Sequence, residues 1–151
     1  KPMNNIQDLA LYLQPLLDRL SPGERAKLAK NIGRDLRTSQ RQRITAQQNP
    51  DGSSYTARRT RLRDQKGKIK RKMFSRIKSN THLKVLSNSE SIAVGFIGRI
   101  NRIAKVHQYG LRDRATRSAP DTVYPKRELL GFTDKEINLV ESSFIKHINI
   151  K

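Results

Sequence analysis

The sequence predicts an α+β fold in which several helices surround a small antiparallel β-sheet. Two observations carry this prediction. Apolar residues recur every three or four positions along most of the chain, and they alternate with polar residues between positions 82 and 97. The first pattern is typical of amphipathic helices, and the second of a half-buried strand pair. The length of 151 residues and the lack of an internal repeat indicate a single domain, 1–151. We expect Lys1 and Pro2 to be added residues ahead of a natural start at Met3.

The first two helices are expected at residues 5–20 and from Pro22 into the mid-forties. Pro15 lies inside the first helix and should kink or interrupt it, because proline has no N–H and crowds the preceding turn. The second helix opens with a capping signal: Ser21 suits the N-cap, Pro22 the first helical position, and Glu24 completes a capping box.

The second helix has one apolar side and one basic side. Leu28, Ile32 and Leu36 share the apolar side. Ile44 falls off this stripe, so the helix should bend or change neighbours there. The opposite side carries a basic ridge, defined as Lys30, Arg34, Arg37 and Arg41. Such a ridge can face a phosphate backbone, solvent or an acidic subunit.

The next stretch reads as a turn followed by a basic arm. Asn49, Pro50, Asp51 and Gly52 form a turn signal. Residues 48–68 are expected to be a flexible basic arm, because they carry many charges and few apolar residues. The spacing of Ile69, Met73 and Ile77 favours a short helix, with a strand as the alternative.

The remaining elements follow from changes of period and from stop signals. Alternation around a turn at 87–90 predicts a β-hairpin. Residues after Gly98 return to helical spacing, and Gly110 stands where a helix should end. A polar loop is expected at 111–124. The last helix should start after Thr133, which has Glu136 three residues on.

The charge indicates an anionic partner. The chain has a formal net charge of +19, and residues 19–78 hold 19 Lys and Arg against 4 Asp and Glu, a net of +15. A field of this size attracts nucleic acid or a strongly acidic protein surface. Only 34% of residues are apolar, so we expect subunits to complete one another's burial.

The search for catalytic chemistry finds no supporting pattern. The sequence has no cysteine and no apolar run near the roughly 20 residues that a membrane span needs. None of His82, His107 and His147 has a second histidine or a carboxylate at helical spacing, and no phosphate-binding glycine motif occurs. We therefore expect no enzyme activity, catalytic residue, metal or cofactor, and no membrane partner.

His107 has a structural interpretation that we favour over a catalytic one. In the last turn of a helix it can satisfy a free carbonyl and complement the negative end of the helix dipole. Tyr109 is then expected to bury its ring, and Gly110 to adopt the left-handed conformation.

Three stretches carry a resemblance to a known family: "NPDGSSY" (49–55), "SIAVGFIGRINRIAKVHQYGLRD" (91–113) and "YPKRELLGFTDKE" (124–136). With the basic second helix, they resemble in order and spacing the bacteriophage virion-morphogenesis family, and within it the tail-completion proteins of contractile-tailed temperate phages. The family's motif residues fall on Asp51, Gly52, Tyr55, His107, Gln108, Tyr109, Gly110, Pro125, Arg127, Leu130 and Gly131.

The resemblance implies a structural role in the virion, at the tail–head junction, for a protein made in the host bacterial cytoplasm. Implied partners are further copies in a ring, commonly six-fold, the tail tube, neck or connector proteins, and phage DNA in the channel. It implies that Gly110 and Gly131 set backbone geometry, that Pro125 fixes the approach to the last helix, and that Arg127 pairs across a subunit boundary.

Four further matters stay open at the level of sequence. The basic residues that contact DNA or a subunit are expected among the basic ridge and the arm, namely Lys30, Arg34, Arg37, Arg41, Arg58, Arg59, Arg61 and Arg63. The alternative function is that of a small basic nucleic-acid-binding protein without enzymatic activity. The sequence also does not separate a terminator ring from a neck ring, or an intact phage from a phage-derived contractile particle.

Overall fold

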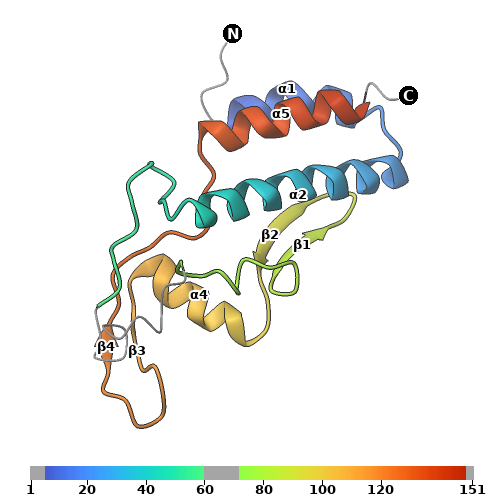
Figure 1. Cartoon of the computed structure of the whole chain (residues 1–151). Helices are drawn as coiled ribbons and strands as arrows, with labels where there is room; N and C mark the ends of the chain where they lie inside the picture. The colour runs from blue at the N-terminus through green and yellow to red at the C-terminus, as the bar shows by residue number, and fades with distance from the viewer. Residues whose placement is uncertain (1–5, 60–71, 149–151) are drawn as a thin grey trace.

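The structure, a computed structural model, describes residues 6–59 and 72–148. In chain order the elements are α1 (Ile6–Leu17), α2 (Pro22–Thr45), β1 (Leu83–Ser87), β2 (Ile92–Phe96), α4 (Arg99–Tyr109), β3 (Arg112–Asp113), β4 (Thr122–Val123) and α5 (Asp134–Ile148). The long helix α2 runs through the middle, with α1 and α5 side by side along one flank and the β1–β2 hairpin and α4 on the other (Figure 1). The predicted α+β class is confirmed.

Helix α2 begins where its capping signal predicts. The Ser21 hydroxyl accepts a hydrogen bond from the Glu24 N–H at 3.2 Å, and Pro22 occupies the first turn. One N–H that the helix leaves without a partner in its first turn is thereby satisfied. The helix continues to Thr45, which agrees with the predicted end in the mid-forties.

Two hydrophobic cores lie on different stretches of α2. The first packs α1, α2 and α5 together through Leu9, Ile32 and Phe144. The second lies under the hairpin, α4 and the chain before α5, and it contains Ile44 and Leu129, both fully buried. Ile44 departs from the apolar stripe of Leu28 and Ile32 because it belongs to this second core, so the predicted change of neighbours is confirmed.

The predicted hairpin is present. Strands β1 and β2 pair antiparallel, with Leu83 opposite Phe96 and Ser87 opposite Ile92. The hairpin lies directly on α2, where a Cβ added at Gly33 would come within 2.3 Å of the Val85 Cγ1. Helix α2 thus uses the missing side chain of Gly33 to approach strand β1 closely.

Three local predictions need correction. Of the kink or interruption expected at Pro15, the interruption is absent, since helix α1 runs through this residue and ends at Leu17. Residues 73–78 form successive turns rather than the short helix or strand expected from Met73 and Ile77. The predicted polar loop contains the two-residue strands β3 and β4, with Arg112 opposite Val123. Ile69 lies outside the described residues.

Candidate functional site

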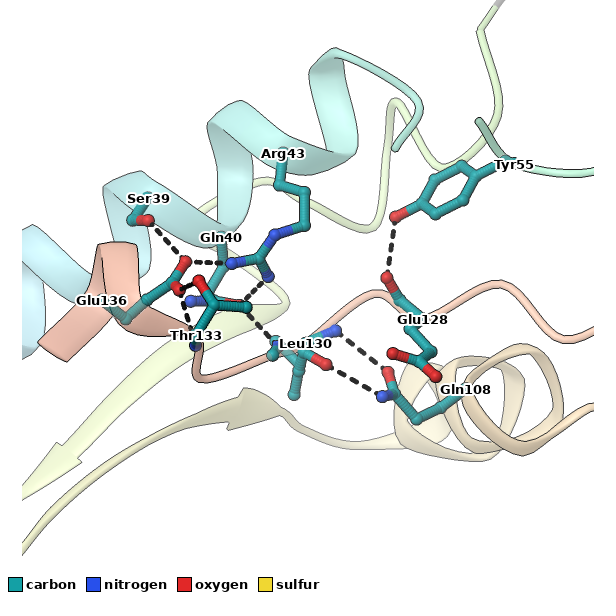
Figure 2. A network of polar contacts seen from close by, with 10 residues as sticks. Ser39, Gln40, Arg43, Tyr55, Gln108, Glu128, Leu130, Thr133 and Glu136 are labelled. Atoms are coloured by element: carbon teal, nitrogen blue, oxygen red, sulfur yellow. Dashed lines mark hydrogen bonds and ion pairs between the residues drawn. The ribbon is translucent and has the colours of Figure 1, made fainter. Parts of the chain in front are cut away.

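An extended segment, residues 124–133, lies between the C-terminal end of α4 and the turns that follow α2. It carries little regular structure of its own, so side chains from both neighbours supply its hydrogen bonds. The Gln108 Oε1 accepts from the N–H groups of Leu129 and Leu130 at 2.8 and 2.9 Å, and its Nε2 donates to the Leu130 carbonyl at 2.9 Å. One amide side chain of α4 therefore holds both polar groups of Leu130, as Figure 2 shows for the Gln108–Leu130 pair.

The turn after α2 holds the same segment from its other side. The Asn49 Oδ1 accepts from the Glu128 N–H at 2.9 Å, and the Tyr55 hydroxyl donates to the Glu128 carbonyl at 3.1 Å (Figure 2). Tyr55 is buried, and burial raises the pKa of its hydroxyl to about 12, which keeps the proton that it donates.

Asp51 and Gly52 shape the turn that presents Asn49. Gly52 has a φ of 88° and donates its N–H to the Asn49 carbonyl at 2.9 Å. The Asp51 carboxylate accepts from the side chain and the N–H of Ser53, and these hydrogen bonds lower its pKa. Asp51 itself is exposed, so its part here is to fix a turn.

Arg127 is buried and bonded within its own chain. Its Nε donates to the Thr56 carbonyl at 2.7 Å, its Nη2 donates to the Ala57 carbonyl at 3.2 Å, and its Nη1 lies 3.3 Å from the His107 Nδ1. With only 4% of the residue exposed, it has no surface to offer a neighbouring subunit. The expectation that Arg127 pairs across a subunit boundary is therefore wrong for this conformation.

The same contacts correct the expectation of a flexible arm over 48–68. Residues 48–57 are tied to the rest of the molecule, since Gln48 and Ser54 form a β-bridge and Tyr55 is buried. Arg58 and Arg59 follow as exposed side chains. Arg61, Arg63 and the remainder of the expected arm, residues 60–68, lie outside the described residues.

His107 is a neutral, packed side chain. Its ring meets Phe74 and Tyr124 edge-on, at centroid distances of 4.8 and 5.1 Å. Burial and the nearby Arg127 charge lower its pKa to about 4. The expectation that it complements the helix dipole as a cation is therefore wrong, because the ring is uncharged at neutral pH. Its Nδ1 accepts from Arg127 when the ring proton is on Nε2.

Gly110 and Gly131 are glycines for different structural reasons. Gly110 ends α4 in the left-handed region, with φ 64° and ψ 51°, and a Cβ there would lie 3.2 Å from the Lys126 backbone nitrogen. A Cβ on Gly131 would come within 2.3 Å of the Pro50 Cγ, so that position needs room for the turn. Tyr109 does not bury its ring as expected: 65% of the residue is exposed.

Leu130 and Pro125 complete the placement of the motif. Leu130 packs partly buried against the second core, whereas Pro125 is exposed at the start of the extended segment. We call this arrangement the clamp, meaning segment 124–133 together with the side chains of Asn49, Tyr55, His107 and Gln108 that hold it. Motif residues spread over 81 positions of sequence, from Asp51 to Gly131, thus lie on or beside one extended segment.

A buried polar network that sequence reasoning missed anchors the end of the clamp. Glu136 is fully buried and accepts from the Ser39 hydroxyl at 3.0 Å and the Thr133 N–H at 2.9 Å, as well as from the Thr133 hydroxyl and the Arg43 guanidinium (Figure 2). Burial alone would raise its pKa, but the bonds from Thr133 and the Arg43 charge outweigh it and hold the pKa below its usual value.

The network extends to the clamp through Gln40. Its Oε1 accepts from the Gly131 N–H at 2.9 Å and from Arg43 at 2.7 Å. Two features of the sequence could have indicated this network. One is the capping box of Thr133 and Glu136, and the other is the polar pair Ser39 and Gln40 on the side of α2 that packs against the rest of the protein. The partner across the fold was not visible in sequence.

The side chains of the clamp form a set of hydrogen bonds and ring contacts. Over residues 6–59 and 72–148, no group of three or more His, Asp or Glu side chains is placed to hold a metal ion. Among the described residues, the ring of His107 contacts the guanidinium of Arg127 and the aromatic rings of Phe74 and Tyr124.

The residues of the basic ridge lie along α2 and differ in exposure. Lys30 and Arg34 are exposed, while Arg37 and Arg41 are half-buried. The Arg41 Nε donates to the Lys78 carbonyl at 3.3 Å. Within the described parts of the chain, no ridge residue takes part in an ion pair.

Comparison with known proteins adds to this geometry. The model of the phage virion morphogenesis family matches residues 4–149, which is nearly the whole chain. The chain belongs to the phage virion morphogenesis family. Tail completion protein S of Escherichia phage P2 is 33% identical over 148 residues, covering 97% of this chain and 99% of that protein. No solved structure matches the chain. None of the helices in the described ranges has the length and apolar character for crossing a bilayer.

Proposed function

We propose that this family member is a structural protein that completes the head-proximal end of a phage tail and prepares it to join the DNA-filled head. The observation that carries the proposal is its similarity, over 97% of the chain and 99% of the relative, to a protein named for tail completion. Likeness over the full length of both proteins makes a shared structural role the simplest reading. The site of action would be the virion, after synthesis in the host cytoplasm.

The surface supports assembly with further copies in a ring, which we propose to be six-fold. Tyr109, Leu111 and Val123, at and beside the β3–β4 ribbon, are 65%, 45% and 54% exposed. Large apolar side chains that a monomer leaves exposed together are typical of protein–protein contacts. The clamp fixes the ribbon to the body of the protein, because β4 leads directly into segment 124–133.

The proposal includes neighbours in the tail. Tube and neck or connector proteins are the partners that a tail-end ring must contact. We further propose that Gly110, Gly131, Gln108, Tyr55 and Arg127 act by keeping the shape of the clamp, with no catalytic residue and no cofactor.

The decisive experiment uses tails lacking this protein. Purified protein added to such tails should bind at one end, appear there as a ring in electron micrographs, and restore joining to filled heads. Native mass measurement of the bound ring gives the subunit number. Protein that binds along the tube, or leaves head joining unrestored, contradicts the proposal.

The alternative is a small basic nucleic-acid-binding protein. The net charge of +19 favours it, and so does the basic ridge, which forms no ion pair with the residues that the structure describes. Tight binding of one nucleic-acid site at physiological salt, together with indifference to tails, would establish the alternative in place of tail completion.

A further inference from the structure

A concave, cationic pocket lies where α2 ends. It has a volume of about 460 Å³, and its lining residues include Ile44 and Met73 together with Lys72, Arg76 and Lys78. We call these three cations and their surroundings the cationic pocket. No acidic residue is among the lining residues.

The shape of the pocket is fixed by hydrogen bonds, because Gln47 holds the segment that carries the cations against the end of α2. The Gln47 Nε2 donates to the carbonyls of Ile44 and Met73 at 2.7 and 2.9 Å, and its Oε1 accepts from the Met73 N–H at 2.9 Å. Gln47 and Phe74 both have positive φ, 58° and 65°. Non-glycine residues adopt this conformation only where surrounding contacts hold it, and such sites often serve a function.

Two of the cations are already oriented. The Lys78 ammonium donates to the Thr45 hydroxyl at 2.6 Å, and the Lys72 ammonium donates to the Thr45 carbonyl at 3.3 Å. Each ammonium has three donors, so each keeps two for another acceptor. The Arg76 guanidinium makes no hydrogen bond or ion pair to the residues that the structure describes.

Stabilising the end of α2 does not account for this charge. A helix C-terminus carries the equivalent of roughly half a negative charge. Lys72 and Lys78 bond to Thr45 there, Arg76 lines the same pocket, and Arg41 bonds to the Lys78 carbonyl. The surplus positive charge in one concave place calls for an external anion.

The pocket continues the basic ridge. Arg41 belongs to the ridge and contacts the pocket segment, so the two form one surface. From Lys30 to Arg41 the ridge extends for about 16 Å along α2, at 1.5 Å per residue. Its members are spaced by four, three and four residues, which gives a regular row of charges.

We propose that the cationic pocket and the basic ridge together bind the phosphodiester backbone of nucleic acid, with a phosphate seated in the pocket. A linear row of Lys and Arg without carboxylates matches a polymer that carries one negative charge per nucleotide. Protein interfaces are, by contrast, depleted of charged residues at their cores. This binding does not depend on ring formation.

The test measures a fluorescently labelled 20-base-pair duplex by anisotropy at several salt concentrations. The triple variant Lys72→Gln, Arg76→Gln, Lys78→Gln is compared with the control Lys105→Gln, Arg117→Gln, Lys135→Gln. Like the pocket variant, the control replaces two lysines and one arginine, but these lie at exposed positions away from the pocket. Both variants therefore have the same net charge.

The proposal expects the pocket variant to lose about tenfold or more in affinity and to flatten the slope of log affinity against log salt by about one unit, since one phosphate is seated in the pocket and each phosphate contact contributes about 0.9. The control should lose less than about threefold in affinity, because its three cations contribute only general charge attraction and contact no phosphate. Equal losses in the two variants would show unspecific charge attraction and overturn the proposal, as would a wild-type chain that does not bind the duplex.

Two further measurements keep the test independent of folding and of ligand class. Arg76→Gln alone removes a cation with no partner in the described chain, so thermal melting should be unchanged while affinity falls.

Poly-L-glutamate of matched charge serves as a mimic of an acidic protein surface. If it competes as strongly as the duplex, and with the same dependence on the pocket, the ligand is an acidic protein and the nucleic-acid proposal is wrong. A normal ring at the tail end in the pocket variant would leave the tail-completion proposal standing whatever the outcome.

Discussion

Gly110 shows at the scale of one residue how the clamp is positioned. The left-handed conformation there lets α4 stop, and the absent side chain lets the backbone of Lys126 pass 3.2 Å from where a Cβ would stand. The Leu111 N–H bonds back to the Val106 carbonyl at 2.8 Å and completes the helix end.

Gly110→Ala should destabilise the protein by about 1–2 kcal/mol, because an L-residue is strained in the left-handed region. The added methyl group also crowds Lys126. Urea unfolding followed by circular dichroism measures the loss. Gly23→Ala is the matched control: a Cβ there meets nothing within 4 Å, and the residue lies in the first turn of α2, so the change should be neutral or slightly stabilising.

His107 gives the protein a defined response to acid. Its folded pKa of about 4 lies below the unfolded value of 6.5, so the folded state holds fewer protons than the unfolded state between these values. The stability that His107 contributes is fully present above pH 6.5 and is lost as the pH falls toward 4. The slope cannot exceed about 1.4 kcal/mol per pH unit for one group.

His107→Gln should flatten the dependence of unfolding free energy on pH between 6.5 and 4, as measured by urea titrations. The carboxylates with lowered pKa values, including Glu136, act below about pH 4.5 and stay unchanged in this variant. A proton NMR titration that gives His107 a pKa near 6.5 would contradict the account of a neutral, packed ring.

At the scale of elements, Glu136 connects α5 to α2. The carboxylate joins Ser39 and Arg43, two positions on one side of α2, to Thr133 at the start of α5. Packing between α2 and α5 through Phe144 sets their distance, and the polar network sets their register along each other.

Glu136→Gln should cost about 3 kcal/mol or more, because removing one member of a buried ion pair leaves the other charge uncompensated. Unfolding in guanidinium chloride measures this, and Glu141→Gln on the same helix is the control that changes the same charge outside the network. An equal effect of the two substitutions would show that the network adds no stability.

The predictable elements were those with local signals. Ser21 with Glu24, Gly110, and Thr133 with Glu136 each mark a helix boundary within a few residues of sequence. The turns at 73–78 were missed because Gln47, a residue 26 positions away from Met73, holds them. The β3–β4 ribbon has two residues in each strand, which is too short to show a period.

Most residues of the clamp could be identified from the sequence, but the contacts between them could not. The motif included Arg127 and His107 but did not show that they contact each other. Asn49 was recognised only as part of a turn, and Gln40 and Arg43 were not singled out. Their partners are separated by 79 to 93 residues in sequence, and no local pattern reports such contacts.

At the scale of the whole molecule, the basic ridge and the exposed apolar side chains near the β3–β4 ribbon belong to different elements. The basic ridge runs along α2, while Tyr109, Leu111 and Val123 lie at and beside the β3–β4 ribbon, at the far end of the structure from α1 and α5 (Figure 1). One surface is suited to an anion and the other to a protein neighbour.

Tyr109→Ser combined with Val123→Ser should weaken self-association at least tenfold, because each removes an exposed apolar side chain from the proposed contact. Sedimentation velocity over a range of concentrations measures this. Leu86→Ser, at a residue 58% exposed on the hairpin, is the control that removes an exposed apolar side chain elsewhere. Equal weakening by the control would place the contact away from the ribbon.

The long separations within the clamp also determine when the molecule can fold. Both hydrophobic cores need residues that come after position 128: Leu129 in one, Ile137 and Phe144 in the other. Closing such distant contacts is slow compared with forming single helices. A chain still emerging from the ribosome would keep the apolar side of α2 uncovered until α5 is made. Folding is thus expected to follow synthesis rather than accompany it, and pausing translation before residue 128 should leave a protease-sensitive nascent chain.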